Sequence, residues 1–223
     1  MSARIGYLAP DLKVSVWVSG PHTNVRQERG RVIFIEIFQV NCPGCFLYGI
    51  PEAIRLFNKY KDKNLSVLGL ATAFEDYDKN TVENLTSLVH SARVIGETRK
   101  VLGELGQLVQ KDKLSFKIAF PVCMDLLVNK ENRSQLSSES ELMYFIKNNI
   151  DDFDSYSETH KQTVIKQVKK YLTAKQYSAL NFEEYHLRGT PSSILIDKKG
   201  ILRYTGFGAN DFLEDRIVGL LDE

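Results

Sequence analysis

The stretch Arg31–Cys45, RVIFIEIFQVNCPGC, decides the fold. Its first eight residues, Arg31 to Phe38, are rich in β-branched and aromatic side chains, which is typical of a central strand buried on both faces. Beyond Cys45, apolar side chains recur at helical spacing, and Leu65 to Ala71 then has the composition of a second buried strand. A strand, a helix and a strand in this order predict a βαβ unit with two parallel strands and a right-handed crossover.

Further elements are predicted on both sides of this unit. Lys13 to Val18 alternates polar and apolar residues, as a half-buried strand does. Pro121 restricts a short strand over Ala119–Cys123 to a sheet edge or a strand start. The remaining expected elements are a helix that begins at Thr81, a helical segment near Thr98–Gln110, a hairpin of Ser193–Asp197 with Ile201–Tyr204, and a last helix over about Asp211–Leu221.

The segment from about 126 to 184 has a different character. It is polar and charged, it contains neither Pro nor Gly, and its apolar residues follow a helical period. One apolar stripe contains Leu142, Phe145, Ile146 and Ile150, and a second runs from Val164 to Leu172. We therefore expect continuous helices here, inserted before the Gly189-Thr190-Pro191 sequence.

Cys42 and Cys45 form a C-x-x-C at the junction between a strand and a helix. Cys42 would lie at the N-cap with Pro43 in the first turn, where free N–H groups and the helix dipole favour a thiolate. Such sites lower a thiol pKa from about 8.5 to roughly 3.5–7.5. Cys45, one turn further, is expected to be more buried and able to attack a mixed disulfide on Cys42. A structural disulfide, a zinc site and coincidence remain alternatives, although the four His residues show no ligand spacing.

The composition excludes some classes of function. The 223 residues carry a formal net charge of +1, which argues against a nucleic-acid binder that relies on bulk positive charge. No apolar stretch of about 18 residues is present, so no membrane span is expected. The first residues show no signal peptide, which predicts a cytoplasmic protein, or a periplasmic one if a leader has been removed.

These motifs together resemble the thioredoxin-like superfamily in its TlpA-type or redoxin branch. The resemblance covers about 1–125 and 185–223 and does not extend to the 126–184 segment, which has the character of an insertion. The residues that carry it are Gly6–Pro10, Trp17, Gly30–Ile33, Cys42-Pro43-Gly44-Cys45, Pro51, Gly189-Thr190-Pro191 and Ile194–Gly200.

The resemblance implies one α/β domain over 1–223, a three-layer α/β/α sandwich with a mixed sheet of four or five strands. Its core would be about 1–125 and 185–223, with an all-helical insertion over about 126–184 before a cis-Pro loop. The Thr190–Pro191 bond would be cis and would face the cysteines.

The implied activity is that of a thiol-disulfide oxidoreductase that exchanges disulfides with protein thiols. Cys42 would attack, Cys45 would resolve, and Thr190, Pro191, Pro43 and Gly44 would contact the substrate, without a metal or organic cofactor. Glu36 lies six residues before Cys42, where thioredoxins carry a buried acid. Burial would raise its pKa and let it exchange a proton with Cys45; the alternative is a carboxylate at a sheet edge that meets solvent or a Lys.

Several features depart from the family or stay open. Asn41 replaces the Trp common before the first cysteine, and Pro43-Gly44 reverses the Gly-Pro of thioredoxin, so the redox potential is not fixed. Glu75, Asp76 and Asp78 follow a parallel strand and should share the sheet edge with Cys42. Cys123 is expected to be a buried inert thiol, or else a third redox or dimer-bridging cysteine.

Two other functions compete. A peroxiredoxin-like peroxidase usually has Pro seven and Thr three residues before its reactive cysteine, but this chain has Ile35 and Gln39 there. A non-catalytic interaction module would use the apolar stripes of the insertion, which could pack on a second copy to give a homodimer.

Overall fold

The computed structural model describes residues 3–129 and 139–223. The chain divides into two compact units, which are Met1–Leu126 with Ala179–Glu223, and Leu127–Ser178. The division does not test whether 1–223 folds as one domain, so that expectation stays a prediction. Among the described residues, no helix is both long enough and apolar enough to cross a bilayer.

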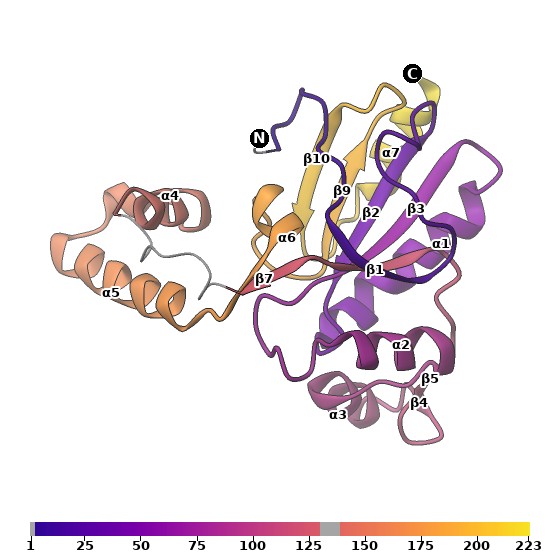
Figure 1. Cartoon of the computed structure of the whole chain (residues 1–223), viewed down its shortest axis with the longest axis horizontal. Coiled ribbons are helices and arrows are strands. Elements are labelled where there is room, and N and C mark those ends of the chain that lie inside the picture. Colours follow the sequence, from indigo (N-terminus) through magenta and orange to yellow (C-terminus); the bar gives the residue numbers. More distant parts are fainter. Residues whose placement is uncertain (1–2, 130–138) are drawn as a thin grey trace. The chain divides into compact units, whose positions relative to one another are not determined.

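The first unit is built around a mixed sheet of six strands in the order β1-β6-β3-β2-β9-β10 (Figure 1). β2 is parallel to β3 and β3 to β6, whereas the β2–β9, β9–β10 and β1–β6 pairs are antiparallel. The sheet is larger than the four or five strands expected, because β1 pairs with β6 and extends it. The strands are β1 (Val14–Ser19), β2 (Val32–Phe38), β3 (Leu65–Ala71), β6 (Val122–Asp125), β9 (Ser192–Ile196) and β10 (Leu202–Phe207).

β2 is the central strand that the sequence predicts. All seven of its residues are buried, because both faces of this strand are covered. Glu36 pairs with Gly69 on one side and Ser193 on the other, and only 1% of its surface is exposed. The alternative of a carboxylate at a sheet edge is therefore wrong.

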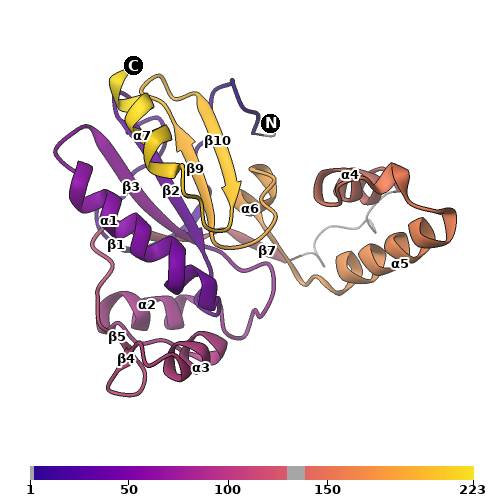
Figure 2. The same cartoon turned by 180° about the vertical axis from the view of Figure 1, so that it is seen from behind.

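Helices cover the sheet. α1 (Ile50–Tyr60) and α7 (Leu213–Asp222) lie on one face over β2 and β3 (Figure 2). The helix predicted to begin at Thr81 is α2 (Val82–Ser91), for which Thr81 is the N-cap, and it packs against β1 and β6. The short α6 (Leu180–Glu184) lies on the other face from α1 and α7 and contacts β6 (Figure 1). The α/β/α layering is thus confirmed.

The first turns after the cysteine pair are wider than an α-helix, which the sequence analysis did not anticipate. Residues Cys45–Gly49 form a π-helix, η1, in which the Ile50 N–H donates to the Cys45 carbonyl five residues back. Pro51 follows directly, lacks an N–H and cannot donate to Leu47, so the regular i to i−4 ladder is interrupted here.

One local prediction is wrong in its bounds, and for a second the structure decides between two alternatives. The helix expected near Thr98–Gln110 is α3 (Gly96–Glu104), which ends because Gly106 adopts φ +67°, and a hairpin of β4 (Leu108–Val109) with β5 (Lys113–Leu114) follows. The strand of Cys123 is not at an edge, since β6 lies between β1 and β3. Pro121 is tolerated because it precedes the strand, where its carbonyl accepts a hydrogen bond from Gly69 N–H.

The second unit contains α4 (Glu139–Asn149), the 3₁₀ turn η3 (Phe153–Ser155) and α5 (Glu158–Ala174). The two predicted stripes meet in one apolar cluster around Ile146, Phe153, Val164 and Val168. The insertion is not all-helical, however, because β7 (Leu127–Asn129) and β8 (Tyr177–Ala179) form a two-stranded sheet where the chain leaves and returns. Residues 130–138 of the predicted insertion lie outside the described residues.

Candidate active site

Cys42 lies directly before the helix that begins at Pro43. The Cys45 N–H donates to the Cys42 carbonyl at 3.1 Å and lies 3.3 Å from Cys42 Sγ, so the thiol acts as an N-cap side chain. The two sulfur atoms are 2.6 Å apart, and both cysteines are free. Cys42 is half-buried and Cys45 is fully buried, as the sequence predicts.

The two thiols differ strongly in acidity. A hydrogen bond from the Cys45 thiol is the main cause that lowers the pKa of Cys42 to about 6, and the Thr190 side chain and the N–H groups of Cys45 and Gly44 add to it. Burial raises the pKa of Cys45, and so does its hydrogen bond to Cys42. The reduced pair therefore holds one thiolate on the accessible sulfur and one proton on the buried sulfur.

The Thr190–Pro191 peptide bond is cis, and its loop faces the cysteines, as expected. Cys42 Sγ lies 3.4 Å from the Thr190 carbonyl oxygen, to which it donates while it is protonated. The Gly44 Cα faces Pro191, since a Cβ built there would lie 3.7 Å from Pro191 Cδ. Of the four expected substrate-contact residues, Pro43, Gly44 and Thr190 are half-buried and Pro191 is buried.

Glu36 lies beneath this loop. A Cβ on Gly49 would collide with Glu36 Oε1 and with Pro191, so the absence of a side chain at Gly49 leaves room for the carboxyl group. Burial raises the pKa of Glu36 well above its usual value, and the charges of Cys42 and Glu52 raise it further. Glu36 Oε1 has no hydrogen-bond partner among the described residues. Glu36 also lines a cavity of about 490 Å³ between α1 and the segment that leads into α7.

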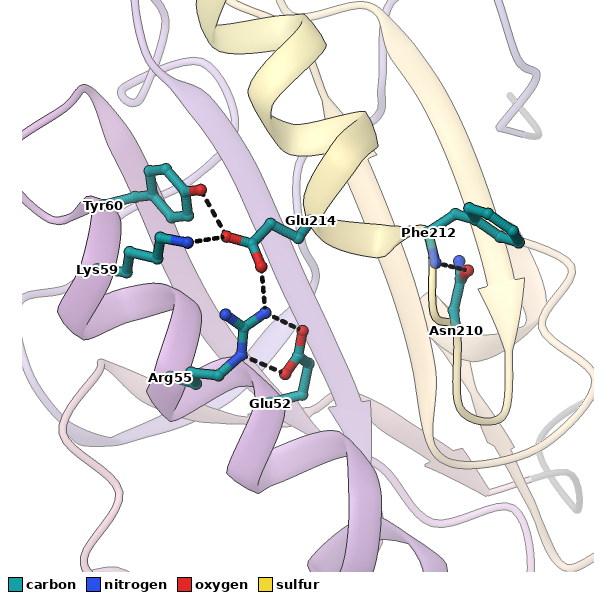
Figure 3. Close-up of polar contacts among 7 residues, drawn as sticks. All are labelled: Glu52, Arg55, Lys59, Tyr60, Asn210, Phe212 and Glu214. Carbon is teal, nitrogen blue, oxygen red and sulfur yellow. Dashed lines mark hydrogen bonds and ion pairs between the residues drawn. The ribbon is translucent and has the colours of Figure 1, made fainter.

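A cluster of charges joins α1 to α7 beside this cavity (Figure 3). Glu214 on α7 accepts hydrogen bonds from Arg55 at 2.6 Å, Lys59 at 2.6 Å and Tyr60 at 2.5 Å. Arg55 also pairs with Glu52 through two contacts of 2.7 Å. These hydrogen bonds, from Arg55 first, lower the pKa of Glu214 to about 2, so Glu214 is ionised near neutral pH and pairs α7 with α1.

Sequence reasoning missed the roles of the two polar residues between β2 and Cys42. Asn41 donates to Asp76 through Nδ2 at 2.7 Å and accepts from Glu97 N–H through Oδ1 at 2.8 Å, while its own N–H donates to Asn80. The residue that replaces the family's Trp thus fixes the loop before Cys42, and it brings Asp76 to the predicted sheet edge. The available signal was the position of these polar residues between a fully buried strand and a cysteine.

Gln39 is the second of them. Only 3% of its surface is exposed, and its side chain bridges the Thr190 hydroxyl and the Glu75 carbonyl.

Cys123 is a buried thiol whose properties differ from those of Cys42 and Cys45. It lies in β6 with no exposed surface, and its weak hydrogen bond goes to the Gly69 carbonyl at 3.6 Å. Burial raises its pKa well above the usual thiol value, which fits the expectation of an inert cysteine. Within residues 3–129 and 139–223, no group of three or more His, Cys, Asp or Glu residues is arranged to hold a metal ion.

A mixed sheet flanked by helices, with a C-x-x-C at the start of a helix and a cis-Pro opposite it, defines a thioredoxin-like protein. The chain has this fold. No protein-family model matches the sequence.

Comparison with known proteins agrees with this class. Two solved structures, a thioredoxin-like superfamily protein and a thiol-disulfide isomerase from Corynebacterium glutamicum, each share 26% identity over 97% of both chains, with TM-scores of 0.58 and 0.57. Over 87 residues, the chain is also 31% identical to protein DipZ of Mycobacterium bovis and of Mycobacterium tuberculosis. That match covers 36% of this chain and only 12% of DipZ.

Proposed function

We propose that this chain is a thiol-disulfide oxidoreductase that exchanges disulfides with protein thiols through Cys42 and Cys45. The observation that carries the proposal is the asymmetry of the pair. One sulfur is accessible and has a pKa of about 6, while its neighbour, 2.6 Å away, is buried and protonated. An attacking thiol works best when its pKa lies near the ambient pH, and a resolving thiol must be kept from solvent until it is needed.

In the reducing direction, the Cys42 thiolate attacks one sulfur of a substrate disulfide. The substrate S–S bond breaks, a mixed disulfide with Cys42 forms, and the released substrate thiolate takes a proton from water. Cys45 then loses its proton and attacks Cys42 Sγ, which forms the Cys42–Cys45 disulfide and releases the second substrate thiolate. Two electrons pass from the dithiol to the substrate, and the oxidised pair runs the same steps in reverse with a substrate dithiol.

Glu36 is suited to accept the proton of Cys45. Burial raises its pKa, and its charge raises the pKa of Cys45, so passing the Cys45 proton to the Glu36 carboxylate leaves one negative charge in the site instead of two. The unpartnered Oε1 leaves the carboxyl free to take a proton. The cavity beside it is polar enough in part to hold water that could carry the proton further.

The substrate surface is formed by Thr190 and Pro191 with Pro43 and Gly44. An extended polypeptide could pair with the Thr190 backbone by strand addition, which would bring its cysteine to Cys42. The thiol-disulfide isomerase of C. glutamicum, which shares 26% identity, supports protein thiols as the substrate class.

The peroxidase alternative is not favoured, since Ile35 is buried within β2 and Gln39 is engaged by Thr190 and Glu75. The cofactor-free reaction, the homodimer, the cytoplasmic location and the role of the insertion stay predictions.

Reduction of insulin disulfides by dithiothreitol tests the proposal. We expect the wild-type chain to accelerate the reaction, and Cys42→Ser to abolish the acceleration because the nucleophile is lost. Cys123→Ala is the matched control, since it removes a buried thiol outside the site and should keep the wild-type rate. Equal rates for the wild-type chain and Cys42→Ser would refute the proposed function.

A further inference from the structure

Gln39 is held from both ends of its side-chain amide. Nε2 donates to the Glu75 carbonyl at 3.4 Å, and Oε1 accepts from the Thr190 hydroxyl at 3.2 Å. The carbonyl of Glu75 can only accept, so it fixes which end of the amide is the nitrogen. Gln39 Oε1 must then face Thr190. Because the side chain is almost fully buried, it has little freedom to turn away.

Thr190 has one hydroxyl proton and two acceptors for it. One is Gln39 Oε1 at 3.2 Å. The other is Cys42 Sγ, which lies 3.4 Å from the carbonyl oxygen of the same residue, and whose pKa a hydrogen bond from the Thr190 side chain lowers. A neutral thiol is a weak acceptor, whereas a thiolate is a strong one. The better partner of the hydroxyl therefore depends on whether Cys42 carries a proton.

We infer that Gln39 is a positioning residue that holds the Thr190 hydroxyl between two acceptors, Gln39 Oε1 while Cys42 is a thiol and Cys42 Sγ once it is a thiolate. Gln39 thus stabilises the thiol form and limits how readily the nucleophile ionises. The relevance of this inference to catalysis rests on the proposed function. The effect on the ionisation of Cys42 in the reduced chain can be measured without turnover.

Other groups also act on the ionisation of Cys42. Cys45 donates from η1, and the Cys45 and Gly44 N–H groups donate from the start of the helix. The Glu36 carboxyl interacts with Cys42 from β2, and Asp76 reaches Asn41, the residue before Cys42. None of these contacts involves the Gln39 side chain. A change confined to that side chain removes its hydrogen bonds to Thr190 and Glu75 and leaves the others in place, so the Thr190 background is needed to isolate the hydroxyl.

The pH profile of Cys42 alkylation by iodoacetamide tests the inference on the full reduced chain. Gln39→Met keeps an unbranched side chain of similar length and removes the acceptor. We expect the midpoint to fall by roughly 0.4–1 pH unit, the equivalent of one neutral hydrogen bond. In a Thr190→Val background, which has no hydroxyl, the same substitution should leave the midpoint unchanged. Thr190→Ser keeps the hydroxyl and should restore the effect of Gln39→Met.

Several outcomes would overturn the inference. An unchanged or raised midpoint in Gln39→Met would do so, and so would an equal shift in the Thr190→Val background, which would indicate a structural effect instead. If Gln39→Met does not fold, as judged by circular dichroism, Gln39→Asn draws the acceptor back by one methylene and should shift the midpoint in the same direction. Loss of insulin reduction with a normal Thr190-dependent shift would count against the proposed function, not against this inference.

Discussion

The contact between the two thiols makes a quantitative prediction. The hydrogen bond from Cys45 is the largest cause that lowers the pKa of Cys42 to about 6. A hydrogen bond to a charged group contributes about 1.5–3 kcal/mol, and one pKa unit corresponds to about 1.4 kcal/mol. Cys45→Ala should therefore raise the pKa of Cys42 by about 1–2 units. At about pH 7, the thiolate fraction would fall from roughly 90% to between about 50% and 10%.

The assay must measure the midpoint of the pH profile of Cys42 alkylation, and not the alkylation rate at a single pH. A thiolate of higher pKa is intrinsically more nucleophilic, with a Brønsted coefficient of about 0.4–0.5, so a single rate near neutral pH would hide part of the change. Alkylation of Cys42 by iodoacetamide across the pH range, with thiolate absorbance as a second readout, gives the midpoint directly. Cys123→Ala is the control, since this buried thiol donates to the Gly69 carbonyl and should not affect Cys42.

Two results would refute this reasoning. A wild-type midpoint near the ordinary thiol value would mean that the start of the helix does not stabilise the thiolate. A midpoint that stays near 6 in Cys45→Ala would mean that the N–H groups and Thr190 suffice, and that the neighbouring thiol contributes little.

Three further predictions follow from buried or paired carboxyl groups. Burial raises the pKa of Glu36, so its contribution to stability is present below its unfolded pKa and is lost as the pH rises through its folded pKa. Glu36→Gln should therefore be more stable than wild type at alkaline pH in thermal melts, yet slower in insulin reduction. An unchanged rate of insulin reduction would remove the proposed role of Glu36. Ion pairs lower the pKa of Glu214 to about 2, so its contribution to stability is present above its unfolded pKa of 4.5 and is lost as the pH falls toward 2. Glu214→Gln should therefore lose less stability than wild type over that pH range. Parallel stability-versus-pH curves for the two proteins would contradict the pairing. Asp125 accepts four hydrogen bonds from Thr72, Asn181 and Phe182. Asp125→Ala should therefore lower the free energy of unfolding by about 3–5 kcal/mol, measured by urea titration. A loss below about 1 kcal/mol would show that water replaces the carboxylate.

The sequence predicts the βαβ unit and the position of the cysteines because both depend on local signals. The run of buried residues in β2, the N-cap position of Cys42 and the period of α1 are all encoded within about a dozen residues each. The π-helix was missed although its cause, Pro51, is visible in the sequence, because Pro near a helix start is usually tolerated. The neighbours of β6 were not predictable, since strand order depends on contacts distant in the chain.

The candidate site shows the same limit. Glu36 was identified because a carboxylate within an apolar strand is conspicuous. Gln39 and Asn41 were noted only as departures from family patterns, because their function depends on Thr190 and Asp76, which lie far from them in the sequence. A polar residue in a loop has no period that could reveal its partners.

The insertion can be long because the first unit closes without it. Leu180 N–H donates to the Leu126 carbonyl at 3.0 Å, so the chain leaves and returns at one point. Asp125, just before that point, accepts hydrogen bonds from Asn181 and Phe182, just after it. The entropic cost of closing a flexible loop rises by only about 0.6 kcal/mol for each doubling of its length, and the apolar cluster of α4 and α5 offsets part of the cost of ordering this segment. The contacts of Thr190 with Cys42 and Gln39 lie within the first unit, so we expect a change in the length of the insertion to leave the cysteine pair undisturbed.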